Sequence, residues 1–113
     1  MSKQISELEK MVANFRAFRH HLPDVGEAYD CLPAEAHKDG VLSGKVKRLM
    51  ALSAALTHGC KACILYQTEE ALKLGASVEE ILESCAVAMS LGGTMAAGET
   101  PRVMEYLQEK GLV

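Results

Sequence analysis

The chain has no Trp and only two Phe and three Tyr among its 113 residues, although 49% of those residues are hydrophobic. The apolar content is therefore mainly small or unbranched, with abundant Ala, Leu and Met, which favours closely packed helices. No stretch has the composition of a flexible linker, so we predict a single domain spanning residues 1–113. So large an apolar fraction with so few bulky aromatics also predicts a homo-oligomer, in which copies of the chain cover each other's apolar surface.

An excess of basic residues is also missing. The 12 Lys and Arg are outnumbered by 15 Asp and Glu, the formal net charge is −3, and both signs are spread along the chain. Without a basic stripe, nucleic acid is not an expected partner. No window approaches the roughly 20 apolar residues of a membrane span, and the first residues contain no apolar stretch of signal-peptide length. We therefore expect a cytoplasmic protein without a membrane partner.

No segment alternates with a period of two, so a sheet is not expected. Apolar residues recur at helical spacing instead, and the pattern predicts an all-α fold of about six helices. The second of these is expected to be short and to end near Pro33, and the last is expected to begin at Thr100 and Pro101. Helices are predicted to begin or end at capping and helix-breaking residues. These are Ser6 with Glu9, Pro23, Pro33, Ser43, Gly59, Gly75, Ser77 with Glu80, Gly92 with Gly93, and Thr100 with Pro101.

Two of the four cysteines, Cys60 and Cys63, are separated by two residues where one predicted helix ends and the next begins. The first N–H groups of a helix have no internal acceptor and together carry about half a positive charge, which favours a thiolate over a thiol. A free cysteine with a pKa near 8.5 is only a few per cent ionised at neutral pH, and roughly 1 to 2 kcal/mol from the helix end would lower that pKa by about one unit. One helical turn also brings both sulfurs within bonding distance, so one can attack a disulfide and the other can release it.

Two other interpretations of this pair stay open. Zinc needs four ligands, and beside one pair the chain offers only scattered candidates, so we expect no metal. Those candidates are Cys31, Cys85, His20, His21, His37 and His58. Alternatively, the two thiols are small apolar core residues. That second interpretation suits Cys85, which falls in an apolar helical repeat, and it is the default for Cys31. Surface positions are expected for His20, His21 and His37.

From residue 43 to residue 107 the sequence resembles the alkyl hydroperoxidase D and carboxymuconolactone decarboxylase family. The resemblance is carried by KRLMAL at 47–52, HGCKACI at 58–64, EALKLGAS at 70–77, EEILE at 79–83 and AMSLGG at 88–93. It implies an all-helical fold, assembly into trimers or hexamers and, in thiol-bearing members, disulfide reductase or peroxidase activity. Members named for lactone decarboxylation lack the thiol pair, which argues against that reaction here.

Two positions depart from the family pattern. Thiol-bearing relatives have a Glu twelve residues before the first Cys and a His four residues after the second, and these form a proton relay. Here the positions hold Arg48 and Gln67. Glutamine can hydrogen-bond a thiolate but cannot take its proton, and losing a positioned base costs about 10² to 10⁴ in rate. Arg48 would instead stabilise a thiolate by charge, or it is a solvated helix residue. His58 is a possible substitute base or a plain helix-end residue.

The sequence therefore predicts a thiol-disulfide oxidoreductase that uses Cys60 and Cys63, with weak hydroperoxide reductase activity in antioxidant defence. Its substrate would be a small-molecule or protein disulfide or a hydroperoxide, its reductant is not identified, and no cofactor is expected. The alternative is a non-catalytic helical oligomer that binds a small ligand or a partner and has a degenerate relay. The family pattern favours Cys63 as the relay-linked sulfur, whereas helix-end electrostatics favours Cys60.

Overall fold

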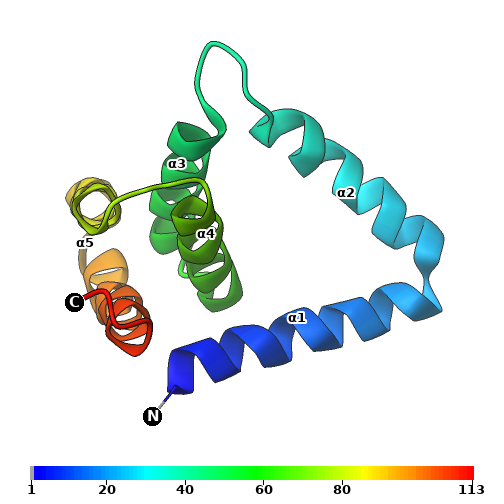
Figure 1. Ribbon diagram of the computed structural model, residues 1–113, viewed down its shortest axis with the longest axis horizontal. Coiled ribbons are helices and arrows are strands. Elements are labelled where there is room, and N and C mark those ends of the chain that lie inside the picture. Colours follow the sequence, from blue (N-terminus) through cyan, green and yellow to red (C-terminus); the bar gives the residue numbers. More distant parts are fainter. Residues whose placement is uncertain (1) are drawn as a thin grey trace.

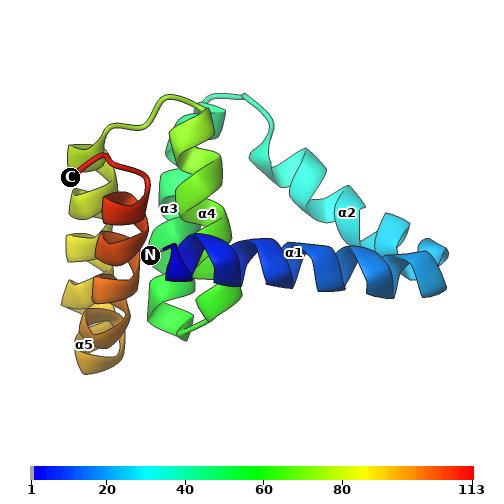
Figure 2. The same cartoon turned by 60° about the horizontal axis from the view of Figure 1, so that its bottom comes forward.

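The computed structural model describes residues 2–113, and these residues form helices without any strand. The helices are α1 (Lys3–His21), α2 (Pro23–His37), α3 (Gly44–His58), α4 (Lys61–Lys73) and α5 (Val78–Glu109). α5 is interrupted at Gly93, where its two halves fold back beside each other (Figure 2). The expected all-α fold is confirmed, and counting the halves of α5 separately gives the expected six helical segments.

The core lies among α3, α4 and α5. Its largest members are aliphatic and fully buried: Leu52, Leu56, Ile64, Ile81, Val103 and Leu107. Cys85 belongs to the same core, with 1% of its surface exposed, and burial raises the pKa of its thiol to about 11. The expectation that Cys85 is a structural residue is thus confirmed, because such a thiol stays protonated and unreactive at neutral pH.

Two of the predicted caps hold the ends of core helices. The Ser43 hydroxyl accepts a hydrogen bond from the Val46 N–H at 3.1 Å at the start of α3. Ser77 and Glu80 form a reciprocal capping box at the start of α5, with distances of 3.1 and 2.9 Å. The Glu80 carboxylate also accepts from Lys45 Nζ at 3.0 Å, so the cap of α5 is tied to α3. The backbone hydrogen bond from Ser77, and then Lys45, lower the pKa of Glu80.

Three predicted boundaries are wrong. α1 begins at Lys3, so Ser6 does not cap it, and the Ser6 N–H donates to the Ser2 carbonyl. Pro33 and Pro101 both lie inside helices that continue past them. A proline removes one N–H from the ladder but leaves the following hydrogen bonds in place. The predicted break at Gly92 and Gly93 is confirmed at Gly93, and the last helical segment begins directly after it rather than at Thr100 and Pro101.

By length and composition, α5 is the one helix in residues 2–113 that could cross a membrane. The chain reverses at Gly93, however, and neither 78–92 nor 94–109 reaches the roughly 20 residues of a span. Ile81, Cys85 and Ala96 of α5 are buried in the core. The helix therefore has the character of a core helix in a helical bundle.

α1 and α2 form an arm that leaves this bundle (Figures 1 and 2). Only the first part of α1 is anchored, through buried Leu8, which packs with Leu65 and Tyr106. The Tyr106 hydroxyl donates to Glu69 Oε1 at 2.9 Å, and burial followed by that hydrogen bond raises the pKa of the phenol. The remainder of α1 and most of α2 extend outward before the chain returns to α3.

The reversal of α5 depends on glycine at position 93. Gly93 has φ 61° and ψ −140°, a region that is essentially restricted to glycine, while nothing lies within 4 Å of where its Cβ would be. Gly93→Ala should therefore lower the free energy of unfolding by about 1 to 3 kcal/mol through backbone strain alone. Chemical denaturation followed by circular dichroism measures this change.

Gly98→Ala is the matched control. Gly98 lies in the second half of α5 and also has open space at its Cβ position, but its φ is not positive. This substitution should stabilise the protein by about 0.5 to 1 kcal/mol. Equal effects of the two substitutions would contradict the assignment of strain to Gly93.

Candidate redox site

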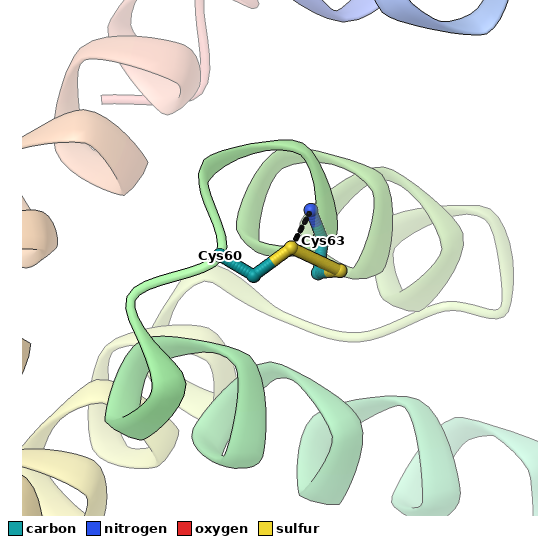
Figure 3. Close-up of a disulfide and its surroundings, with 2 residues drawn as sticks. All are labelled: Cys60 and Cys63. Atoms are coloured by element: carbon teal, nitrogen blue, oxygen red, sulfur yellow. Dashed lines mark hydrogen bonds between the residues drawn. A yellow bond between two sulfur atoms is a disulfide. The ribbon is translucent and has the colours of Figure 1, made fainter. Parts of the chain in front are cut away.

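Cys60 and Cys63 form a disulfide at the start of α4 (Figure 3). Cys60 is the N-cap residue, with extended backbone at φ −82° and ψ 101°, and Cys63 lies in the first helical turn. The two Cα atoms are 5.3 Å apart. Cys63 is exposed and Cys60 is half-buried, so the pair lies at the surface rather than in the core.

The Cys60 sulfur also serves as the cap of α4. It accepts a hydrogen bond from the Cys63 N–H at 3.3 Å, which is the dashed line in Figure 3. That N–H is one of the donors that a helix start leaves without an internal acceptor. A sulfur in this position receives both the hydrogen bond and the favourable end of the helix dipole, and both would stabilise a thiolate.

The turn before the pair is set by Gly59, which has φ 73°. Its N–H donates to the Ala55 and Leu56 carbonyls, and the Cys60 N–H also donates to Ala55, so the end of α3 is satisfied. A Cβ on Gly59 would lie 3.0 Å from the Met95 sulfur, because α5 packs against this turn. The left-handed backbone conformation therefore favours glycine before Cys60, and a larger residue would also have to displace the flexible Met95 side chain.

Arg48 and Gln67, which replace the expected relay residues, are in contact with each other. Arg48 Nη1 donates to Gln67 Oε1 at 2.9 Å, and the guanidinium also lies 5.8 Å from the centre of the Tyr66 ring. Gln67 follows Cys63 by one helical turn and so lies on the same side of α4. Arg48 is half-buried and paired, which contradicts the interpretation that it is a freely solvated residue.

His58 and Cys31 are both on the surface. His58 is the exposed last residue of α3, two residues before Cys60. Cys31 is exposed on α2, and its thiol donates to the Glu27 carbonyl at 3.3 Å. The expectation that Cys31 fills a core position is therefore wrong. In residues 2–113, no three His, Cys, Asp or Glu side chains are grouped so that they could hold a metal ion.

His37 is a feature that the sequence did not reveal. It ends α2 where the chain meets the start of α3, it is half-buried, and its Nδ1 is buried without a hydrogen-bond partner among residues 2–113. Burial lowers the pKa of His37, and the charges of Arg48 and Lys47 lower it further, against an opposing effect of Glu70. The sequence predicted a surface position for His37, and its buried Nδ1 contradicts that prediction.

The sequence and the fold of this chain are both similar to those of known proteins. Residues 23–105 match the model of the carboxymuconolactone decarboxylase family. An uncharacterized protein of Cupriavidus necator is 29% identical over 101 residues, which cover 89% of each chain. A carboxymuconolactone decarboxylase family protein of Legionella pneumophila has a crystal structure similar to this one, with a TM-score of 0.90 and 28% identity over 96% of this chain and 97% of that one. A family protein of Thermotoga maritima, whose suggested role is in the antioxidative response, has a TM-score of 0.71 and 30% identity over 76% of this chain and 89% of that one.

The environment of His37 predicts a pH dependence of stability. Because its pKa is lowered on folding, the unfolded chain takes up the proton first as pH falls through the ordinary histidine value of about 6.5. Stability should therefore be constant above that range and decrease below it. His37→Gln should reduce this decrease, as measured by denaturation midpoints between pH 7.5 and pH 5.5 at intervals of about 0.5.

His20→Gln is the control, since His20 is exposed on α1. It should leave the pH dependence of the wild type in place. If His37→Gln showed the same slope as the wild type, burial of its imidazole would have no consequence for folding.

Proposed function

Given that this chain belongs to the carboxymuconolactone decarboxylase family and has a disulfide at a helix start, we propose that it is a thiol-disulfide oxidoreductase. Cys60 and Cys63 cycle between dithiol and disulfide, and the enzyme also reduces hydroperoxides slowly in antioxidant defence. The suggested antioxidative role of the Thermotoga maritima relative supports the second activity. The cycle needs neither a metal nor a bound organic cofactor.

The observation that carries the proposal is the hydrogen bond from the Cys63 N–H to the Cys60 sulfur. In the reduced pair the same N–H would stabilise a thiolate at Cys60, which makes Cys60 the nucleophile. The Cys60 thiolate attacks a substrate disulfide, one substrate sulfur leaves as a thiolate that takes a proton from water, and a mixed disulfide forms. Cys63 loses its proton to water and attacks Cys60, which releases the second substrate thiolate. The pair has then lost two electrons, and the substrate has gained them.

A dithiol reductant restores the pair by the reverse exchange. The disulfide lies at the surface with Cys63 exposed, which suits substrates that present an accessible disulfide, either small or carried on a protein. The other two thiols are free, one exposed and one buried, and free thiols persist in a reducing compartment such as the cytoplasm.

The Arg48–Gln67 pair supports disulfide exchange more than peroxide reduction. Its hydrogen bond fixes a positive charge on the side of α4 that carries Cys63, but neither side chain can move a proton at neutral pH. The same contact favours the second candidate function, a non-catalytic binding protein, because the Gln67 oxygen already has a structural partner. Measurement of turnover separates the two functions.

Purified protein should reduce lipoamide and the disulfides of insulin when a dithiol reductant is supplied. Cys60→Ser and Cys63→Ser should each abolish this turnover to background, because both sulfurs take part in the exchange. Trapping the thiols after equilibration in glutathione buffers should give a single two-electron transition between dithiol and disulfide.

Cys31→Ser is the matched control, because Cys31 is exposed but lies on α2 and forms no disulfide. It should retain wild-type turnover. Activity that survives the loss of either paired sulfur would end the oxidoreductase proposal, and inactivity of the wild type toward every disulfide tested would favour the binding protein.

Arg48 should affect how readily the reduced pair ionises. In Arg48→Ala, the pH midpoint for alkylation of the reduced pair by iodoacetamide should move upward by several tenths of a unit to about one unit, because a nearby positive charge is lost. Arg48→Lys preserves the charge and should preserve the midpoint. An identical midpoint in all three proteins would exclude activation by charge.

The contact between positions 48 and 67 permits a second measurement on the same pair. The double substitution Arg48→Glu and Gln67→His introduces the acid and the imidazole that the relay of thiol-bearing relatives contains. Hydroperoxide reduction should then rise by about 10²- to 10⁴-fold, the usual contribution of a positioned base. Unchanged peroxide turnover would mean that the relay positions do not limit this activity.

A further inference from the structure

The Cys60–Cys63 disulfide lies in the basic part of an acidic protein. Residues 37–68 contain five Lys or Arg and one Asp, which gives a formal net charge of +4. The remainder of the chain contains seven Lys or Arg and 14 Asp or Glu, which gives −7. A substrate that approaches the disulfide at the turn between α3 and α4 therefore meets a local charge opposite in sign to that of the whole protein.

No carboxylate on α3 or on the first half of α4 offsets this positive charge. α3 contains neither Asp nor Glu. The acidic residues of α4 are Glu69 and Glu70 in its second half, and Lys73 pairs with them at 3.7 and 3.1 Å. On α5, Glu99 lies one turn beyond Met95 but is paired with Arg102 at 3.0 Å. The positive field at the disulfide is therefore left for a ligand to neutralise.

Two cations beside the disulfide have no carboxylate partner. Lys61 is exposed at the first position of α4, between the two cysteines in the sequence. Arg48 reaches α4 one helical turn after Cys63, where it donates to Gln67. Neither Lys61 nor Arg48 forms an ion pair within residues 2–113. Both can therefore pair with an anionic group of a substrate.

The Arg48–Gln67 pair presents several N–H donors to one ligand. A guanidinium carries five N–H groups, and the hydrogen bond to Gln67 Oε1 uses one of them. Gln67 accepts through its oxygen, and its amide nitrogen makes no hydrogen bond within residues 2–113. The Tyr66 ring, 40% exposed, lies 5.8 Å from the guanidinium carbon and supports the cation. Neighbouring guanidinium and amide donors of this kind match the two oxygens of a carboxylate.

We propose that Arg48 and Lys61 select small disulfides that carry carboxylates. The inference rests on the proposed function and names its substrate class. Arg48 with Gln67, or the Lys61 ammonium, holds a carboxylate of the substrate while the substrate disulfide meets the Cys60 sulfur. The exchange is unchanged, since the thiol pair becomes a disulfide and the substrate disulfide becomes two thiols. The cations determine which substrate is held there.

The experiment compares three disulfides that differ only in their end groups. Dithiodipropionate is anionic, hydroxyethyl disulfide is neutral and cystamine is cationic. The kcat/KM for the anionic disulfide divided by that for the neutral one should fall by about three- to tenfold in Arg48→Ala and in Lys61→Ala. The ratio for cystamine should rise. Ionisation of the thiol pair affects all three substrates alike, so it cancels from these ratios.

Lys47→Ala is the matched control. It removes the same charge from the residue next to Arg48, but the Lys47 ammonium donates to the Lys38 carbonyl at 2.7 Å in the segment before α3. This variant should keep the wild-type ratio. Added sodium chloride should lower the wild-type ratio, because salt screens the attraction between exposed charges. Circular dichroism checks that each variant keeps its helices.

Binding of suberate is a second measurement, and it needs no turnover. Suberate has the chain length and the two carboxylates of dithiodipropionate but no disulfide. At millimolar concentration and constant ionic strength, it should shift the NMR signals of the Cys63 backbone amide and the Gln67 side-chain amide in the wild type. The same addition should leave these signals in place in Arg48→Ala.

The two measurements separate failure of the selectivity from failure of the redox function. Turnover of hydroxyethyl disulfide, with ratios that Arg48→Ala and Lys61→Ala leave unchanged, would overturn the selection by charge and keep the oxidoreductase. Suberate binding that depends on Arg48, without turnover of any disulfide, would support carboxylate recognition and end the redox proposal. Absence of both turnover and suberate binding would overturn both.

Discussion

The turn between α3 and α4 is the constraint on which the candidate site depends. Within two residues, Gly59 and Cys60 close the carbonyls of one helix with their N–H groups and supply the sulfur that caps the next. The left-handed conformation of Gly59 makes so short a reversal possible, and Met95 fills the space beside it. The reversal places α4 antiparallel to α3, which brings position 67 against position 48. The thiol pair and its neighbours therefore follow from one backbone feature.

Local signals in the sequence predicted much of this structure. Caps such as Ser43 and Ser77 act within three residues, and the Cys60 and Cys63 spacing acts within one turn, so neither needs knowledge of the fold. Pro33 and Pro101 gave wrong boundaries because a helix tolerates one missing donor when the rest of its ladder is intact. Because α2 continues past Pro33, His37 lies near the start of α3. The residues next to His37 in the sequence do not predict this contact.

Composition described the chain correctly but did not show where its scarce aromatics lie. A small core of Leu, Ile, Val and Ala is formed by α3, α4 and α5, with Cys85 and Tyr106 as its less usual members. The buried Tyr106 is satisfied by Glu69, so even the polar atom at the base of the arm has a partner. Phe15, Phe18 and Tyr29 lie instead on the arm formed by α1 and α2, where they are 43% to 62% exposed.

The replacement of an acid and an imidazole by Arg48 and Gln67 separates two requirements of thiol chemistry. Disulfide exchange needs a thiolate, and a fixed positive charge together with a helix N-terminus can stabilise one while the proton goes to water. Peroxide reduction also needs a proton for the departing alkoxide or hydroxide, and arginine and glutamine cannot supply it at neutral pH. A site built with the Arg48–Gln67 hydrogen bond is thus expected to retain the first reaction and to lose rate in the second. In the proposed enzyme, this single contact would decide which of the two reactions predominates.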